Sequence, residues 1–569
     1  METAEKVCPV CGKKTEKAVP ASIFYCDACQ TPLIFTAGKE HKTCSLCGAP
    51  VRYLGKDLRP VFPEERLLLE ILWGKPAQSL ARASLWACGG RYYIDGRAKT
   101  ISLRQLAGFD TQQIASELRR RRAETPLEET AFRAQVARFV EANAVRFAAL
   151  VAEAQHFVIE TAQKFPRENI VLSFSGGKDS TVTADLVTKA LADPSLVHIF
   201  GDTTLEFPTT LAYARRFQAE HPYAIFQVAR NDDQSFRDVA SDIGPPARQM
   251  RWCCSMFKTG PITRVLNDLY PAEHVLTFYG IRRAESVSRS KYRRVESDAS
   301  QVKIHKQTVA APLIDWLDLD VWLYLLTEKI DFNAAYRLGY ERVGCWLCPN
   351  NNKRDIFLSA IYWPERAAAW RDFLIGFAKR IGKPDPENYV DSGAWKARQG
   401  GNGLASAEDV KIRFTNCTAE DHAKIYRLTR PYGEELLNLF VPFGRVAPEL
   451  GRKILHETLV LDAKSKVPIL SLQPFAEDGW RYAVKVRTLN VADHEKLQTQ
   501  AAYQIRKFNA CRGCLKCESI CQAGAISLRA GYHIDPALCV HCKMCVTAKY
   551  LRGGCMMEKY LRTRVEQEN

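Results

Sequence analysis

The cysteines are the residues of this chain whose type and spacing indicate chemistry most directly. The sequence has 20 cysteines among 569 residues, and all except Cys88 and Cys417 fall into three groups. In a reducing compartment, clustered CxxC pairs indicate metal ligands rather than disulfides. We therefore expect metal sites near the start, in the middle and near the end of the chain.

The first group consists of the pairs CPVC, CDAC and CSLC before residue 50. Two such pairs bring four thiolates into a tetrahedron, which is the geometry of structural zinc. The stretch CGAPVRYLG after the third pair is typical of a ribbon strand, which favours the second and third pairs as ligands. The predicted zinc ligands are Cys26, Cys29, Cys44 and Cys47. Cys8 and Cys11 would form a spare or competing pair, and surface thiols without a metal are the alternative.

The last group has the spacing of bacterial ferredoxins, CxxCxxCxxxC, in the stretch CRGCLKCESIC. A second run, CVHCKMC, follows, and in two-cluster ferredoxins the fourth cysteine of each run serves the other cluster. One predicted 4Fe-4S ligand set is Cys511, Cys514, Cys517 and Cys555, and the second is Cys539, Cys542, Cys545 and Cys521. Gln522 stands where proline usually follows, and the gap before Cys555 is long. Zinc knuckles are the alternative.

The stretch SFSGGKDS, residues 173–180, follows a predicted strand and opens a predicted helix. Gly176 and Gly177 let the backbone approach a ligand closely, and a helix N-terminus offers free N–H groups. Lys178 adds charge, and Ser175 and Ser180 add hydroxyl groups. These features predict a phosphate cradle, although Asp179 after the lysine excludes a Walker A loop. A bare Gly-Gly turn is the alternative.

Residues 166–350 alternate between short β-rich and helical stretches. IVLSF, VHIFGD, AIFQVA and VLTFYGI read as strands, whereas STVTADLVTKALA and TTLAYARRFQAE read as helices. This order predicts an α/β domain with a parallel sheet and right-handed crossovers.

SGGKDS after a strand resembles the PP-loop of the adenine nucleotide alpha-hydrolase-like superfamily, and residues 165–355 resemble its phosphoadenosine phosphosulfate (PAPS) reductase family. FGDTTLEFPTT resembles the second-strand motif of that family, which implies that Asp202 and Glu206 lie near the nucleotide. GIRRAESVSRS resembles its arginine-rich substrate loop. The residues implicated there are Arg282, Arg283, Ser286 and Arg289. Guanidinium groups match phosphate or sulfate oxygens bidentately; a solvated charge run is the alternative.

RWCCSMFKTGP places Cys253 beside Cys254, and neighbouring cysteines hardly bond each other without strain. With Cys345 and Cys348 in GCWLC, the arrangement resembles the cluster-binding set of assimilatory adenosine phosphosulfate (APS) reductases. The resemblance implies a 4Fe-4S cluster on these four thiolates, with Lys258 as a basic residue near it. Zinc at the same thiolates and unliganded core cysteines are the alternatives.

One feature departs from those reductases: the chain lacks the C-terminal ECGxH segment that supplies their nucleophilic cysteine. Cys417, in RFTNCTAED, lacks the expected surroundings and is better interpreted as a structural cysteine. The intact pair Lys178–Asp179 is also more typical of enzymes that act on the pyrophosphate of ATP.

The remaining composition limits the partners. With 80 Lys and Arg against 64 Asp and Glu, the net charge is +16, which favours nucleotides or RNA. We find neither a signal peptide nor an apolar run long enough to span a bilayer, so we expect a cytoplasmic protein without a membrane partner. The basic run LRRRRAE, residues 118–124, is interpreted as a solvated helix face, with RNA contact as the alternative.

The expected architecture has five parts. These are a zinc ribbon (1–50), a partly helical connecting domain (51–165), the central parallel-sheet PP-loop domain (166–355), a mixed α/β accessory region (356–505) and a ferredoxin-like α+β domain (506–569). The accessory region carries no motif that indicates a function.

The sequence favours a fused redox enzyme that reduces APS or PAPS to sulfite, with electrons passing from a low-potential donor through the ferredoxin-like domain. The residues expected to be catalytic are Lys178, Asp179, Lys258, Arg282, Arg283 and Arg289. Those expected to bind the nucleotide are Ser175, Gly176, Gly177, Lys178, Asp179, Ser180, Asp202, Glu206 and Ser286.

Two other functions stay open. ATP-dependent sulfur transfer to tRNA or a small molecule would use ATP with Mg²⁺, and a non-enzymatic electron-carrying or regulatory module would bind nucleotide without turnover. The sequence also leaves open whether APS or PAPS is the substrate, which protein donates the electrons and what the oligomeric state is.

Overall fold

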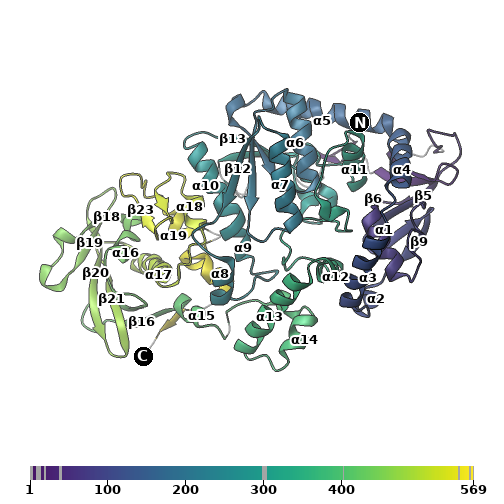
Figure 1. Cartoon of the computed structure of the whole chain (residues 1–569). Coiled ribbons are helices and arrows are strands. Elements are labelled where there is room, and N and C mark those ends of the chain that lie inside the picture. The colour runs from purple at the N-terminus through teal and green to yellow at the C-terminus, as the bar shows by residue number, and fades with distance from the viewer. Residues whose placement is uncertain are drawn as a thin grey trace.

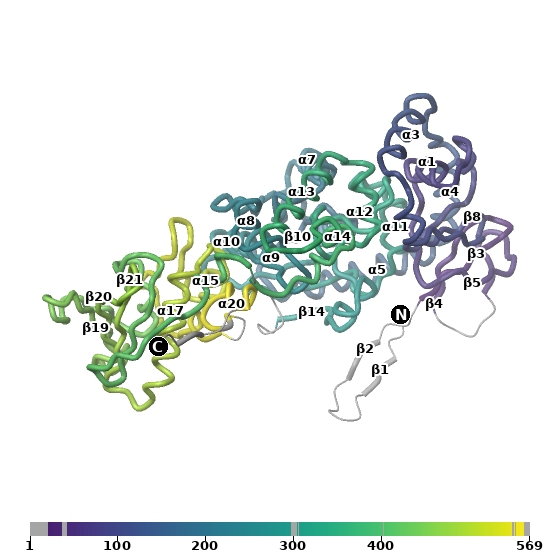
Figure 2. The backbone as a smooth tube through the Cα atoms, turned by 90° about the horizontal axis from the view of Figure 1, so that it is seen from below, coloured from purple at the N-terminus to yellow at the C-terminus, as the bar shows by residue number. Residues whose placement is uncertain are grey.

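The computed structural model describes residues 4–7, 14–17, 21–36, 42–297, 304, 306–401, 403–548, 551–562 and 565–567. Cys8 and Cys11 therefore lie outside the described residues. The nucleotide-binding domain occupies the centre of the molecule, with the N-terminal module at one end and the C-terminal parts at the other (Figures 1 and 2). No helix in the described ranges combines the length and apolar character needed to cross a membrane.

The central domain is built on a six-stranded sheet in the order β12-β11-β10-β13-β15-β14. Its parallel strands are β10 (Ile170–Phe174), β11 (Val197–Asp202), β12 (Ile225–Arg230), β13 (Val275–Tyr279) and β15 (Gln307–Ala310). Only the short β14 (Val295–Glu296) runs antiparallel. The predicted α/β fold with a parallel sheet is confirmed.

The central strand β10 is buried on both faces, as expected for a parallel strand between helices. Leu172 and Phe174 pack toward α5 (Ala144–Ala162), α6 (Lys178–Leu191) and α7 (Pro208–Glu220). Val171, between them, packs on the opposite face against α10 (Gly260–Leu269). This two-residue alternation orients the carboxyl end of β10, where the PP-loop begins.

After the pair β1 (Ala4–Val7) and β2 (Lys14–Lys17), the described part of the N-terminal module contains two further antiparallel sheets. β3 (Ala21–Cys26), β4 (Thr31–Thr36) and β5 (Arg52–Gly55) form the first, so the ribbon sheet runs past residue 50. β6 (Arg59–Pro60), β7 (Leu85–Cys88), β8 (Arg91–Ile94) and β9 (Arg97–Thr100) form the second. The helices of the module are α1 (Pro63–Leu72), α2 (Leu103–Ala107), α3 (Thr111–Glu124) and α4 (Glu129–Ala142). Strands of two to four residues carry too little periodicity to be predicted.

The accessory region begins with α12 (Lys353–Tyr362), α13 (Pro364–Arg380), α14 (Pro386–Asp391) and α15 (Ala405–Val410). A seven-stranded sheet follows, in the order β18-β19-β20-β21-β17-β16-β24. Its strands are β16 (Ile412–Asn416), β17 (Ala423–Leu428), β18 (Gly444–Ala447), β19 (Thr458–Asp462), β20 (Pro468–Glu477), β21 (Trp480–Thr488) and β24 (Val565–Gln567). Helix α17 (His494–Ala510) shares the apolar core of this sheet and leads directly into the last cysteine group.

The last cysteine-rich unit consists of short elements: α18 (Lys516–Ile520), β22 (Ile526–Ser527), β23 (His533–Ile534), α19 (Met544–Thr547) and α20 (Met556–Leu561). One apolar core joins this unit to the nucleotide-binding domain and includes Phe257, Leu515 and Tyr560. Figure 1 shows the unit in yellow between the accessory sheet and helices α8 (Phe236–Ile243) to α10. The unit is thus docked against its neighbour.

Candidate nucleotide and metal sites

The PP-loop is held in shape by its own hydroxyl groups and by a distant tyrosine. Gly176 has a φ of +67°, and a Cβ there would lie 2.9 Å from the Thr210 side chain, so a larger residue does not fit. The Ser175 backbone N–H donates to Ser180 Oγ at 3.1 Å. The Lys178 backbone N–H donates to the Tyr336 hydroxyl at 3.0 Å, a contact that the sequence did not predict.

Two cations and two carboxylates meet at the start of α6. Lys178 Nζ lies 3.0 Å from carboxylate oxygens of both Asp179 and Asp318. The Arg282 guanidinium also contacts both carboxylates, at 2.7 Å for Asp318. Burial alone would raise the pKa of Asp179, but Arg282 and Lys178 outweigh burial and hold that pKa well below its usual range. The cations are therefore held in place for an anionic ligand.

The N-terminal module contributes a carboxylate to this cluster. Asp57 accepts the backbone N–H groups of Asp318 at 2.8 Å and Leu319 at 3.1 Å, which begin helix α11 (Asp318–Thr327). Burial and the neighbouring Asp318 carboxylate raise the pKa of Asp57 to about 7. Neither Asp57 nor Asp318 was predicted from the sequence as part of the site.

The other residues of the arginine-rich loop do not converge on the PP-loop. Arg283 pairs with Asp315 and donates to the Tyr292 carbonyl at 3.1 Å. Arg289 pairs with Glu285, and its backbone N–H donates to Ser286 Oγ at 3.2 Å. Of the predicted loop residues, only Arg282 reaches the carboxylates beside Lys178.

The loop after β11 connects the nucleotide side of the sheet with the middle cysteines. Asp202 ends β11 and accepts the Thr204 backbone N–H at 2.8 Å. The Thr203 hydroxyl donates to Glu206 at 2.7 Å and lies 3.4 Å from Cys345 Sγ. Burial raises the pKa of Glu206, although the hydrogen bond from Thr203 and the charge of Lys258 lower it in part. Glu206 and Cys345 also form a backbone β-bridge.

The four middle cysteines lie together. Cys253 and Cys254 end the short helix α9 (Trp252–Cys254), and a π-helical turn over Ser255–Thr259 follows. Cys253 is within electrostatic reach of Cys254, Cys345 and Cys348. A hydrogen bond from Cys253, together with Arg251 and Lys258, lowers the pKa of the Cys254 thiol to about 5. Lys258 also interacts with Cys345, so it lies beside the set as expected.

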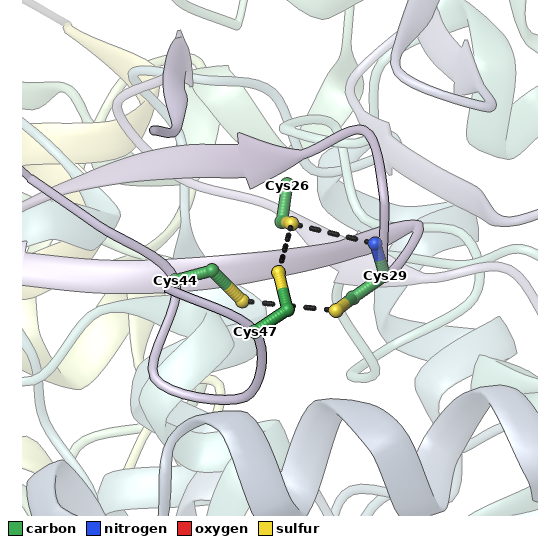
Figure 3. Close-up of side chains that lie close together, drawn as sticks. All are labelled: Cys26, Cys29, Cys44 and Cys47. Atoms are coloured by element: carbon green, nitrogen blue, oxygen red, sulfur yellow. Dashed lines mark hydrogen bonds between the residues drawn. The ribbon is translucent and has the colours of Figure 1, made fainter. Parts of the chain in front are cut away.

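The N-terminal set is more compact. Cys26 Sγ lies 3.6 Å from Cys47 Sγ, and Cys44 Sγ lies 3.9 Å from Cys29 Sγ (Figure 3). Sulfurs around a tetrahedral zinc lie about 3.8 Å apart, because each Zn–S bond is about 2.3 Å long. The four predicted thiols therefore fit one zinc ion without rearrangement.

Among the described residues, no other group of three or more Cys, His, Asp or Glu has all its ligand atoms within 4.8 Å of one another. The middle and C-terminal cysteine sets are thus more widely spaced than a single zinc ion requires. A cuboidal cluster of four irons and four sulfides separates its thiolates more widely than one ion does. In the described part of the chain, these two sets therefore lack the compact arrangement of the N-terminal set.

The last eight cysteines divide into two neighbourhoods. Cys514 is within electrostatic reach of Cys511, Cys517 and Cys555. Cys539 interacts with Cys521 and Cys542, and Cys545 interacts with Cys521 and Cys539 but also with Cys517 of the first set. The neighbourhoods therefore follow the two predicted ligand sets, which meet at Cys517 and Cys545. Lys507, which is 1% exposed, lies between the sets and donates to the Cys545 carbonyl at 2.5 Å.

The first C-terminal set faces the middle set across a close contact. The Tyr560 and Ser255 hydroxyls lie 3.1 Å apart, and Tyr560 is within electrostatic reach of Cys514, Cys253 and Cys254. A Cβ at Gly260 would lie 2.6 Å from Leu515 Cβ, so only glycine permits this approach. The sequence did not predict this junction.

The remaining predicted residues lie elsewhere. Cys88 is exposed at the end of β7, and Cys417 follows β16 in the seven-stranded sheet. In the basic run of α3, Arg120 pairs with Glu117 and Glu124, so part of its charge is neutralised within the helix.

Comparisons with known proteins place the central domain. Residues 169–351 match the family model of the phosphoadenosine phosphosulfate reductase domain. An uncharacterized protein of Methanocaldococcus jannaschii is 33% identical over 240 residues, which are 42% of this chain and 48% of that protein. An adenosine 5'-phosphosulfate reductase of Oceanobacillus iheyensis is 28% identical over 193 residues, which are 34% of this chain and 75% of that protein.

Among solved structures, the PAPS reductase of Candida auris in a phosphate complex aligns with a TM-score of 0.29 and 20% identity, covering 34% of this chain and 89% of that chain. This chain also matches a second uncharacterized protein of Methanocaldococcus jannaschii. It spans about half the length of each of these two relatives. The family match and the APS reductase relatives support placing residues 169–351 in the PAPS reductase family.

Proposed function

We propose that this chain is an iron–sulfur sulfonucleotide reductase, which reduces APS or PAPS to sulfite with electrons that a low-potential donor supplies through the ferredoxin-like unit. The loop after β11 is the observation that carries this proposal. This loop follows β11, which pairs with the PP-loop strand β10. Its residues Thr203 and Glu206 contact Cys345. The loop therefore joins a nucleotide cradle to a cysteine set.

The PP-loop residues would hold the nucleotide. Ser175, Gly176, Gly177 and Ser180 form the cradle, and Lys178 and Arg282 supply positive charge. Both cations are now paired with Asp179 and Asp318, and phosphate oxygens would take over part of this pairing. Arg283 is paired with Asp315 outside the loop and Arg289 with Glu285 inside it, so their predicted contact with the substrate requires those pairs to open.

The reaction breaks the S–O bond of the phosphosulfate. The adenosine phosphate leaves with the bridging oxygen and the bonding electron pair, and two further electrons reduce S(VI) to S(IV) as sulfite. Fixed cations stabilise charge that develops on a leaving phosphate, which is the role proposed for Lys178 and Arg282. Cys253, Cys254, Cys345 and Cys348 would hold a 4Fe-4S cluster, which supplies one-electron chemistry when bound. Cys417 follows β16 of the seven-stranded sheet and does not lie in the central domain, so it does not take the place of the missing nucleophilic cysteine. In this proposal, direct electron supply replaces that cysteine.

The alternative is ATP-dependent sulfur transfer to tRNA or a small molecule. The ionised Asp179 at the start of α6 favours it, because such a carboxylate suits the Mg²⁺ that accompanies ATP. The pairing of Arg120 within its own helix gives no additional support for an RNA substrate.

One experiment separates the two functions. The full chain is purified anaerobically, its iron and zinc are counted, and reduced methyl viologen is added with APS, PAPS or ATP in parallel. We expect sulfite from APS or PAPS, and a loss of sulfite in Arg282→Ala at unchanged iron content. Pyrophosphate or AMP from ATP without sulfite would overturn the reductase in favour of sulfur transfer.

A further inference from the structure

The two cysteine sets of the last unit differ in their exposure to solvent. In the inner set, Cys514, Cys517 and Cys555 are buried, at 9%, 8% and 5% exposure. In the outer set, Cys545 is buried, Cys521 and Cys539 are partly buried, and Cys542 is exposed. The inner set faces Cys253 and Cys254 through Tyr560, whereas the outer set reaches the surface at Cys542.

The loop of residues 538–544, here the outer loop, carries both cysteines Cys539 and Cys542 and an unusual number of exposed apolar side chains. Leu538, Val540 and Met544 are 51%, 69% and 38% exposed. An apolar centre of this kind with a polar rim is the usual anatomy of a protein interface. Electron-transfer encounters bury little area, so three such side chains suffice for the centre.

Three lysines lie at the outer loop, against the two carboxylates of Asp462 and Asp535, and Asp535 accepts the Ala537 backbone N–H at 2.8 Å. Lys543 lies within the loop, with its ammonium 5.2 Å from the centre of the Phe443 ring. Lys543 also interacts with Asp462, so the turn between β19 and β20, with the exposed Lys464 and Lys466, lies beside the loop. Asp462 accepts the backbone N–H groups of Lys464 and Ser465, so its own charge is partly satisfied. The chain as a whole carries a charge of +16.

We propose that the outer loop is the surface on which a small acidic protein, carrying a low-potential one-electron centre, docks to supply electrons. The inference rests on the proposed function, because it names the partner of the same redox path. Opposite charges steer and orient the encounter, and the apolar centre brings the partner close to Cys542. Each sulfonucleotide consumes two electrons, so two partner molecules are oxidised by one electron each per sulfite.

Binding tests the proposal directly. The probe is an acidic two-cluster bacterial ferredoxin, titrated calorimetrically into the reconstituted full chain under anaerobic conditions at low and high salt. We expect Val540→Asp and Lys543→Glu each to weaken binding at least about tenfold, and high salt to weaken the wild type. The matched control is Val145→Asp on α5, since Val145 is 86% exposed and lies in another domain. This variant should bind ferredoxin with the same affinity as the wild type.

A second readout is the rate at which cluster absorbance bleaches in stopped flow, at equal iron content. Ferredoxin should reduce the two outer-loop variants more slowly, whereas methyl viologen should reduce all variants equally, because a small donor needs no docking surface. Unchanged ferredoxin affinity in both variants would overturn the proposal. A dimer in the wild type that Val540→Asp converts to a monomer would also overturn it, in favour of a second copy of this chain.

The failure of the proposed function is a separate outcome. If viologen reduces the clusters but no sulfite forms from APS or PAPS, the reductase assignment fails, while the ferredoxin affinities still report on the outer loop.

Discussion

Both cysteine-rich ends share an apolar core with the central domain, but the ion pairs at the two junctions differ in burial. At the N-terminal junction, Glu65, 1% exposed, contacts Arg59 at 2.6 Å within the module and Arg354 of α12 at 2.7 Å. At the C-terminal junction, Arg264 of α10 contacts Glu518 of α18 at 2.9 Å, and both side chains are partly exposed. The two ends therefore differ in how deeply their ion pairs are buried.

Sulfur spacing separates the same two ends. The N-terminal thiols already have the spacing of one zinc ion, whereas the C-terminal sets are wider. The comparison therefore teaches that the N-terminal thiols are arranged for one metal ion and the C-terminal thiols are not, which supports the proposed division into a structural end and an electron path. Each prediction below tests one side of this contrast.

The largest expected effect is the loss of zinc. In Cys26→Ser/Cys29→Ser, we expect zinc to fall from about one ion per chain to none, with iron unchanged, because two of four thiolates are lost. A structural zinc contributes on the order of 10 kcal/mol to the folding of its module. Elemental analysis and limited proteolysis of residues 21–60 measure both effects. Cys88→Ser, at an exposed cysteine outside the sets, should change neither metal; iron loss in the double variant would contradict the prediction.

Breaking the buried ion pair should have the next largest effect. Glu65→Ala leaves the buried Arg59 with only the longer contact to Glu341, at 3.4 Å, and we expect the free energy of unfolding to fall by about 3 kcal/mol. Urea denaturation measures this loss in the free energy of unfolding. Glu117→Ala, which removes an ion pair from the surface of α3, should cost far less. Equal losses in the two variants would show that the buried network does not anchor the module.

The apolar junction gives a smaller effect. In Gly260→Ala, the new Cβ overlaps Leu515, and we expect a loss of about 1–3 kcal/mol and a weaker magnetic coupling between the middle and inner clusters in paramagnetic resonance spectra. Gly376→Ala in α13 is the matched control, since nothing lies within 4 Å of its Cβ position, and alanine there should stabilise the helix by up to about 1 kcal/mol. Stabilisation in both variants would refute the close junction.

The smallest effect concerns pH. The folded-state pKa of Asp57, about 7, lies above its ordinary value of 3.8, so the folded chain holds a proton that the unfolded chain releases between these values. The contribution of Asp57 to stability is therefore present at low pH and lost as the pH rises toward 7. We expect the stability of Asp57→Asn relative to wild type to increase by on the order of 1 kcal/mol from pH 5.5 to 6.5. A constant difference across this range would contradict the raised pKa.

The sequence predicted what is encoded locally. The PP-loop, the parallel strands around it and the division of the last eight cysteines follow from residues close together in the chain or from fixed spacings. The compact zinc geometry of Cys26, Cys29, Cys44 and Cys47 also follows from two CxxC pairs.

What escaped prediction depends on contacts between distant segments. Asp57 meets Asp318 across 261 residues, and Ser255 meets Tyr560 across 305. No local pattern marks such pairs, because only the folded chain brings them together. Arg283 and Arg289 show the converse limit: a motif predicts them at the substrate, but it says nothing of the carboxylates of Asp315 and Glu285, with which they pair in the structure.

The position of Cys555 has a consequence for how the protein is made. Its inner-set partners, Cys511, Cys514 and Cys517, leave the ribosome much earlier, and Tyr560, which contacts the middle set, is synthesised later still. On this ligand assignment, the inner set cannot be complete before Cys555 has been synthesised, nor the junction closed before Tyr560. We therefore expect the cluster-loading machinery to act after these residues have emerged, and nascent chains truncated before Cys555 to bind less iron.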